Sequence, residues 1–139
     1  MRYYFSKTLT SSFDETVAKV TAELKKEGFG VITEIEVKEA LKEKLDVDFK
    51  RYRILGACNP AFAHEALQVE DKIGTMLPCN VIVQEISAGV VEVAAIAPIA
   101  SMQAIDKAKL KSVAEHVQAQ LKRVIAALRN EKKGKSQRE

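Results

Sequence analysis

The sequence predicts an α+β fold, a two-layer sandwich in which a curved, mostly antiparallel sheet carries long helices on one face. Three observations predict this fold. Short alternating or β-branched segments recur between segments with helical periodicity. Two amphipathic segments, one near each end of the chain, are long enough to cover the same face of a sheet. The 139 residues contain neither a repeat nor a linker, so we expect one domain over residues 1–130.

The first half of the chain predicts two strands, each followed by a helix. Aromatic residues mark the first strand, and the apolar residues from Phe13 to Leu24 then recur at helical spacing. Serines suit the start of that helix, and Gly28 can close it. The expected elements are a strand over residues 2–8, a helix from Ser11 or Ser12 to Gly28, a strand over 29–36 and a short helix over 37–45.

The second half predicts a strand and a helix, then a hairpin, then the longest helix. Asn59 is a good N-cap and Pro60 suits the first helical position, which places a helix directly after the third strand. Gly89 favours a tight hairpin loop. The expected elements are a strand over 51–58, a helix buried through Ala63, Ala66 and Leu67, strands over 79–86 and 90–97, an irregular segment or single turn over 98–105, and a long helix capped by Asp106.

Charge and composition exclude several classes of protein. The net charge is +3, and residues 131–139 contribute four basic and two acidic side chains, so the body is nearly neutral. A nearly neutral body argues against a nucleic-acid partner. No apolar run reaches the ~20 residues that span a bilayer, so we expect no membrane partner. We expect residues 131–139 to be a disordered basic tail.

The cysteine count and the start of the chain bear on location. No apolar leader segment is visible near the N-terminus. Cys58 and Cys79 are the only cysteines, and without an export signal we expect free thiols in a reducing compartment. These features together indicate a cytoplasmic protein.

Four segments are specific enough to compare with known families. The most specific are Tyr52-Arg53-Ile54-Leu55-Gly56-Ala57-Cys58-Asn59-Pro60 and Leu77-Pro78-Cys79-Asn80-Val81, and the others are Gly28-Phe29-Gly30-Val31 and Val47-Asp48-Phe49. Together they resemble the domain of unknown function 302 family of small bacterial and archaeal proteins, and the likeness covers most of residues 3–128. The resemblance implies a fold like one unit of the TATA-binding protein and a homodimer, but no catalytic residue, and the fold alone does not imply DNA binding.

Two Cys-Asn pairs form the candidate site. Cys58 ends a strand just before a helix N-terminus, where unpaired N–H groups favour a thiolate, and Cys79 begins the next strand. If those strands are neighbours, the two sulfurs meet at one edge of the sheet. We therefore expect a ligand site made of Cys58, Asn59, Cys79 and Asn80, above an apolar floor of Ile54 and Val81.

Three functions remain open for this site. The thiols could hold a thiophilic metal such as Cu(I) or Zn, with Cys58 and Cys79 as ligands. They could cycle between dithiol and disulfide. The asparagines and the helix N-terminus could instead bind a small ligand, with the thiols as walls. His64 is a candidate third metal ligand, or a base for Cys58 in an enzyme, although we expect no catalysis.

The alternative is a structural or interaction module with buried, structural cysteines. His116 is expected on the surface, and Glu34 and Glu36 on a solvated strand face. The apolar stripe of the last helix is long. If Leu110 and Leu128 cannot both be covered within one chain, the surplus favours a homodimer.

Overall fold

The computed structural model describes residues 2–131, which form one five-stranded antiparallel sheet with helices packed on one face. The strand order is β1-β5-β4-β3-β2, and every neighbouring pair is antiparallel. The elements are β1 (Tyr4–Thr10), α1 (Phe13–Lys26), β2 (Gly30–Glu36), α2 (Val37–Leu45), β3 (Tyr52–Cys58), α3 (Pro60–Val69), the 3₁₀ helix η1 (Ile73–Met76), β4 (Cys79–Ser87), β5 (Val90–Ile96), α4 (Pro98–Ser101) and α5 (Ala108–Ala127). The predicted α+β sandwich is confirmed.

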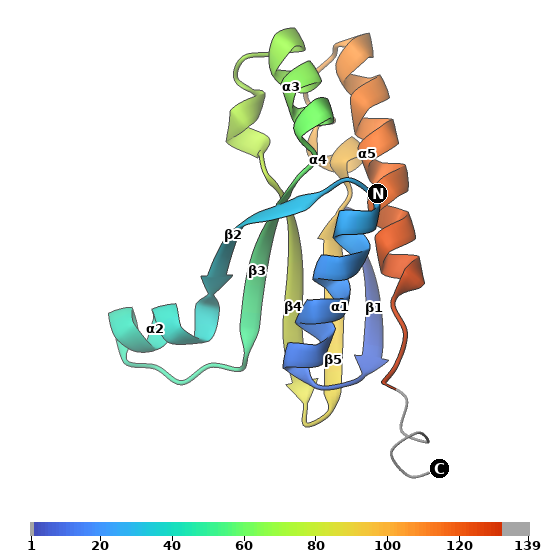
Figure 1. Cartoon of the computed structure of the whole chain (residues 1–139). Coiled ribbons are helices and arrows are strands. Elements are labelled where there is room, and N and C mark those ends of the chain that lie inside the picture. Colours follow the sequence, from blue (N-terminus) through green and yellow to red (C-terminus); the bar gives the residue numbers. More distant parts are fainter. Residues whose placement is uncertain (1, 132–139) are drawn as a thin grey trace.

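Helices α1 and α5 lie across the same face of the sheet, while α3 and η1 continue beyond its end (Figure 1). Each strand directs alternate side chains toward these helices. In β4 the buried positions are Cys79, Val81 and Val83, and in β5 they are Val91, Val93 and Ala95. Within residues 2–131 no helix covers the other side of the sheet, which we call the open face.

The predicted ends of α1 agree with the structure, whereas the predicted cap of the last helix does not. The Ser12 hydroxyl accepts a hydrogen bond from the backbone N–H of Glu15, and Gly28 has a positive φ after the end of α1. The prediction that Asp106 caps the last helix is wrong. Helix α5 begins at Ala108 without a side-chain cap, and Asp106 instead pairs with Lys111 at 3.1 Å.

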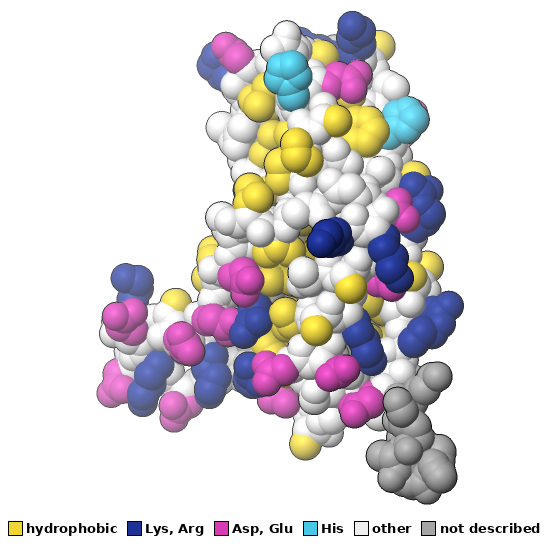
Figure 2. Space-filling model, viewed as in Figure 1, with side chains coloured by type: hydrophobic (Ala, Val, Ile, Leu, Met, Phe, Trp, Pro, Cys, Tyr) yellow, Lys and Arg dark blue, Asp and Glu magenta, His cyan; other side chains and the backbone are white. Residues whose placement is uncertain are grey.

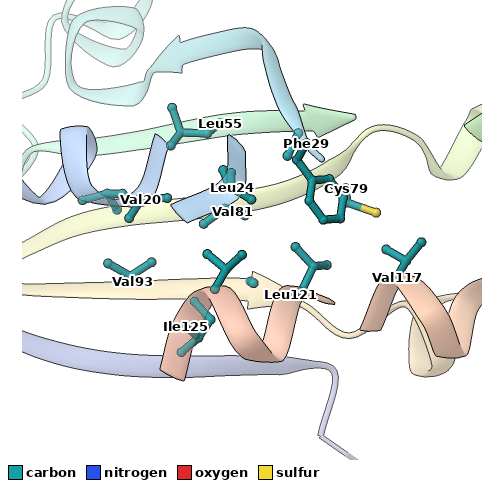
Figure 3. Packing of buried hydrophobic residues seen from close by; sticks show 14 of the residues in the cluster. Val20, Leu24, Phe29, Leu55, Cys79, Val81, Val93, Val117, Leu121 and Ile125 are labelled. Carbon is teal, nitrogen blue, oxygen red and sulfur yellow. The ribbon is translucent and has the colours of Figure 1, made fainter. Parts of the chain in front are cut away.

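The core lies between the sheet and the helices α1 and α5. Figure 3 shows Leu24 of α1, Val81 of β4 and Leu121 of α5 in one cluster, and each is completely buried. Leu110 and Leu128 are both 1% exposed. The stripe of the last helix is therefore covered within one chain, so the condition under which it would have favoured a homodimer is not met among residues 2–131.

Residues 30–50 form an arm that projects from the body (Figure 1). Strand β2 is an edge strand, held to β3 by its backbone ladder and by ion pairs from Glu34 and Glu36 to Arg53. None of the nine residues of α2, all of them described, is buried. A helix this short has little stability in isolation, because its own hydrogen bonds barely offset the cost of nucleation.

The C-terminal residues and the membrane prediction can be compared with the structure only within residues 2–131. Of the expected basic tail, only Glu131 is described, and its N–H donates to the Thr10 carbonyl at 2.8 Å; residues 132–139 lie outside the described residues. Among residues 2–131 no helix combines the length and the apolarity needed to cross a bilayer.

Candidate functional site

An apolar cavity of about 340 Å³ lies at the end of the sheet, where α3 and α5 diverge beyond the strands. Its walls come from β3, α3, η1, the start of β4, α4 and α5. Figure 2 shows hydrophobic side chains gathered over this end of the molecule. Two aromatic rings, Phe29 and Phe62, lie in the wall, and the other apolar lining includes Ala66, Met102, Val113, Ala114 and Val117.

The sheet brings both predicted cysteines to this cavity. Strands β3 and β4 are neighbours, and Ala57 lies opposite Cys79 in their register. Cys58 is therefore displaced by one residue from Cys79, at the point where β3 ends and the chain turns into α3. Cys58 is half-buried, Cys79 is 8% exposed, and both are free thiols that line the cavity.

The environment of Cys79 keeps its thiol protonated. Burial raises the pKa of Cys79 to about 11, and the nearby Cys58 adds to the rise. Figure 3 shows Cys79 beside Phe29 at the end of the core cluster, with its sulfur directed away from Val81. At neutral pH this side chain is accordingly an uncharged, polarisable part of an apolar wall.

A short polar network closes one side of the cavity. Asn59 is the N-cap of α3, as predicted, and its Oδ1 accepts a hydrogen bond from the Phe62 N–H at 3.5 Å. Its Nδ2 donates to Oε1 of Gln120 at 3.3 Å, and Gln120 in turn donates to the carbonyl of Glu27. The network joins the ends of α1 and α3 to α5, so the polar groups next to the cavity are satisfied by one another.

Two of the predicted site residues lie elsewhere. Asn80 follows Cys79 in β4 and therefore points to the open face, away from the cavity. His64 is exposed on α3, where its ring lies 3.3 Å from the side-chain amide of Gln68, and it does not line the cavity.

The expected apolar floor of Ile54 and Val81 is wrong. Ile54 points to the open face opposite Ile82, and Val81 is enclosed in the core without lining the cavity. Leu67, expected on the buried side of its helix, is 42% exposed at the rim. The real walls, Phe29, Phe62, Met102 and Val117, come from segments far apart in sequence. Among the wall residues, only Val113 and Val117 show a sequence pattern, their helical spacing. That spacing does not distinguish a cavity wall from ordinary packing of a helix on the core.

The donor set for a metal ion is small. Among residues 2–131 no group of three or more histidine, cysteine, aspartate or glutamate side chains is placed to hold a metal. The two thiols remain as soft donors, but His64 does not complete the set.

Comparisons with known proteins place the chain in a family. The family described as "Domain of unknown function DUF302" matches residues 5–128. A crystal structure of an uncharacterized conserved protein DUF302 from Bacillus stearothermophilus is similar at a TM-score of 0.83 and 27% sequence identity, over 91% of this chain and 98% of that chain. No curated protein matches. The extent of the match, in sequence and in fold, shows that the chain belongs to the DUF302 family.

Proposed function

We propose that the protein binds a small apolar molecule in the cavity between α3 and α5, with Cys58 and Cys79 in its wall. The observation that carries this proposal is the lining of the cavity, which is almost entirely carbon and sulfur. Its volume of about 340 Å³ falls at the lower end of the ~300–1,000 Å³ typical of ligand sites. A ligand of one or two rings, with few polar groups, matches this size and chemistry.

The state of Cys79 favours a neutral ligand over a metal or a redox role. Metal ligation and disulfide exchange both use the thiolate. With a pKa of about 11, Cys79 holds its proton at neutral pH, and forming the thiolate there is unfavourable because burial disfavours the charged form. A neutral thiol beside the ring of Phe29 instead contributes polarisable contact surface to an apolar ligand.

A direct test uses fluorobenzene as the probe and ¹⁹F NMR as the readout. We expect the wild-type protein to bind it, since a cavity lined by aliphatic and aromatic side chains readily accepts such a molecule. Ala114→Leu fills the cavity from α5, because Ala114 is 3% exposed and lines it. Ala119→Leu makes the same change on the exposed side of the same helix and is the matched control.

The expected result is binding by the wild type and Ala119→Leu, with affinity reduced by about tenfold or more in Ala114→Leu. Native mass spectrometry of gently purified protein adds the search for a retained natural ligand. If the wild type fails to bind fluorobenzene and other small arenes, or if Ala114→Leu binds as well as the wild type, the cavity is not a site. The cysteines would then be structural, as the alternative function requires.

We also propose that the binding domain is a homodimer, formed through the arm of residues 30–50. The exposed apolar side chains of the arm are Ile32, Ile35, Leu45, Val47 and Phe49, and Leu45 is 67% exposed. Residues 37–50 carry four lysines against four carboxylates, and Figure 2 shows the two signs interspersed there. Such a surface is complementary to itself, which favours a second copy over a strongly charged partner.

A further inference from the structure

The open face of the sheet contains a second hollow, of about 370 Å³, remote from the thiols. It lies over β4 and β5, on the side of the sheet opposite the helices. Its floor is aliphatic, and Ile82 and Ala94 lie opposite each other in the β4–β5 register. Its rim is aromatic, with Tyr4 toward one end and Tyr52 toward the other.

One carboxylate lies in this hollow, and it has an amide neighbour but no cation. Glu92 is opposite Gln84, which is opposite Tyr52, so the three side chains form one cross-strand row. The amide Nε2 of Gln84 donates to Oε1 of Glu92 at 2.9 Å. Within residues 2–131 no lysine or arginine forms an ion pair with Glu92, although it is half-buried. A half-buried carboxylate that is held by one amide has acceptor capacity left for a cationic donor.

The tyrosine rings add a second attraction for positive charge. The faces of aromatic rings carry negative potential and bind cations within about 6 Å of the ring centre. At the far end of the hollow this attraction is already visible, since the guanidinium of Arg2 lies 5.1 Å from the centre of the Tyr4 ring. Tyr4 lies opposite Ile96, and Ile96 is four residues, or about 13 Å, along β5 from Glu92.

We infer that this hollow binds a small organic cation, a protonated amine with an apolar body. The ammonium group pairs with Glu92, in the same cross-strand row as Tyr52, while the apolar body lies on Ile82 and Ala94. Carboxylate, aromatic rim and aliphatic floor each match one part of such a molecule, and the Gln84 amide holds the carboxylate in place. The cavity of the thiols lies on the other face of the sheet, so this inference stands independently of the function proposed above.

The probe for the test is phenethylamine at pH 7, and its uncharged analogue 2-phenylethanol is the matched control. Titrations are followed by the backbone amide signals of Gln84, Glu92 and Ala94 in ¹H–¹⁵N spectra. We expect phenethylamine to shift these signals and 2-phenylethanol to bind at least about tenfold more weakly, because it lacks the charge-assisted contact. Glu92→Gln keeps the size of the side chain and removes its charge, and it is expected to weaken amine binding by a similar factor.

Three outcomes would overturn the inference. The first is equal affinity for the amine and the alcohol, and the second is unchanged amine affinity in a folded Glu92→Gln protein. The third is a dimer that buries Gln84 and Glu92 between two copies. Intermolecular NOEs at these residues, in a sample that mixes labelled and unlabelled protein, would detect it. Tyr52→Leu, which leaves the carboxylate in place, gives a second measurement if Glu92→Gln does not fold, and retained amine affinity in that variant also contradicts the inference.

Discussion

Asn59 of α3 and Gln120 of α5 are joined by a hydrogen bond of 3.3 Å, from Nδ2 of the first to Oε1 of the second. The same asparagine caps α3 through its Oδ1. One side chain therefore starts the helix that forms one wall of the apolar cavity and ties that helix to the opposite wall.

Replacing Asn59 should lower the free energy of unfolding through two separable effects, the loss of the α3 cap and the loss of the bond to Gln120. Asn59→Ala removes both the cap and the bridge, and we expect it to lower the free energy of unfolding by about 1–2 kcal/mol. Asn59→Asp keeps an acceptor for the Phe62 N–H, where the helix dipole favours negative charge, but loses the donor to Gln120. Urea denaturation should rank the wild type above Asn59→Asp and Asn59→Ala below both. Equal stabilities of wild type and Asn59→Ala would show that neither bond matters.

The raised pKa of Cys79 predicts that stability falls at high pH. An unfolded thiol ionises near its ordinary value of 9.0, whereas the folded thiol holds its proton to about 11. Between these values the unfolded state binds fewer protons, so the free energy of unfolding declines as pH rises. The stabilising contribution is complete below pH 9 and is lost toward pH 11, on the order of 2 kcal/mol.

The measurement compares wild type and Cys79→Ala by urea denaturation at pH 7.5, 9 and 10.5. Lysines and tyrosines titrate in both proteins, so only the difference between the two curves reports on the thiol. We expect the advantage of the wild type to shrink with pH. A constant difference would mean that Cys79 is hydrated and ionises normally.

Gly56 has no space for a side chain. A Cβ at this position would lie 2.8 Å from Cγ of Pro78 and closer still to Oγ1 of Thr33. We expect Gly56→Ala to cost about 1–3 kcal/mol by overpacking at the β2–β3–β4 junction. The matched control is Gly30→Ala, where the added Cβ meets nothing within 4 Å. Thermal unfolding should separate the two variants, and equal melting temperatures would contradict the prediction.

If the protein dimerises through the arm of residues 30–50, one charged substitution in the arm should weaken the dimer. Leu45→Glu places a carboxylate on the most exposed large apolar side chain of the arm, and we expect the dimer dissociation constant to rise by about tenfold or more. Ile86→Glu makes the same change at the hairpin end of the sheet, where Ile86 is 51% exposed, and should leave the mass unchanged. Light scattering after size-exclusion chromatography gives the mass directly. A monomeric mass for the wild type at a protein concentration of tens of micromolar would contradict the proposed dimer.

Local signals were sufficient to predict most of the fold. Ser12, Asn59, Gly28 and Gly89 act through their own backbone neighbours, which is why the sequence identified a cap, a helix end and a hairpin at those positions. The prediction for Asp106 is wrong because the same side chain can cap a helix or pair with a nearby lysine, and in this chain it pairs with Lys111, five residues later.

The sequence predicted that the two cysteines lie at one site, but it did not predict which side chains surround them. Cys58 and Cys79 line the same cavity because β3 and β4 are neighbours, an assumption that the sequence allowed but could not require. Asn80 was assigned with Cys79 because the two are adjacent in sequence, whereas a strand directs adjacent side chains to opposite faces. The wall residues Phe29 and Met102 carry no shared pattern, since only the tertiary packing brings their segments together.

Strand β4 separates the two hollows by the thickness of a single backbone, with Cys79 facing one and Asn80 facing the other. This partition supplies an internal spectroscopic reporter. If a molecule fills the thiol-lined cavity and displaces Cys79, the peptide unit that Cys79 shares with Asn80 moves with it, and we expect the side-chain amide resonance of Asn80 to shift. Binding in the proposed site would then be followed from the opposite side of the sheet, without a label in the cavity and without altering either cysteine.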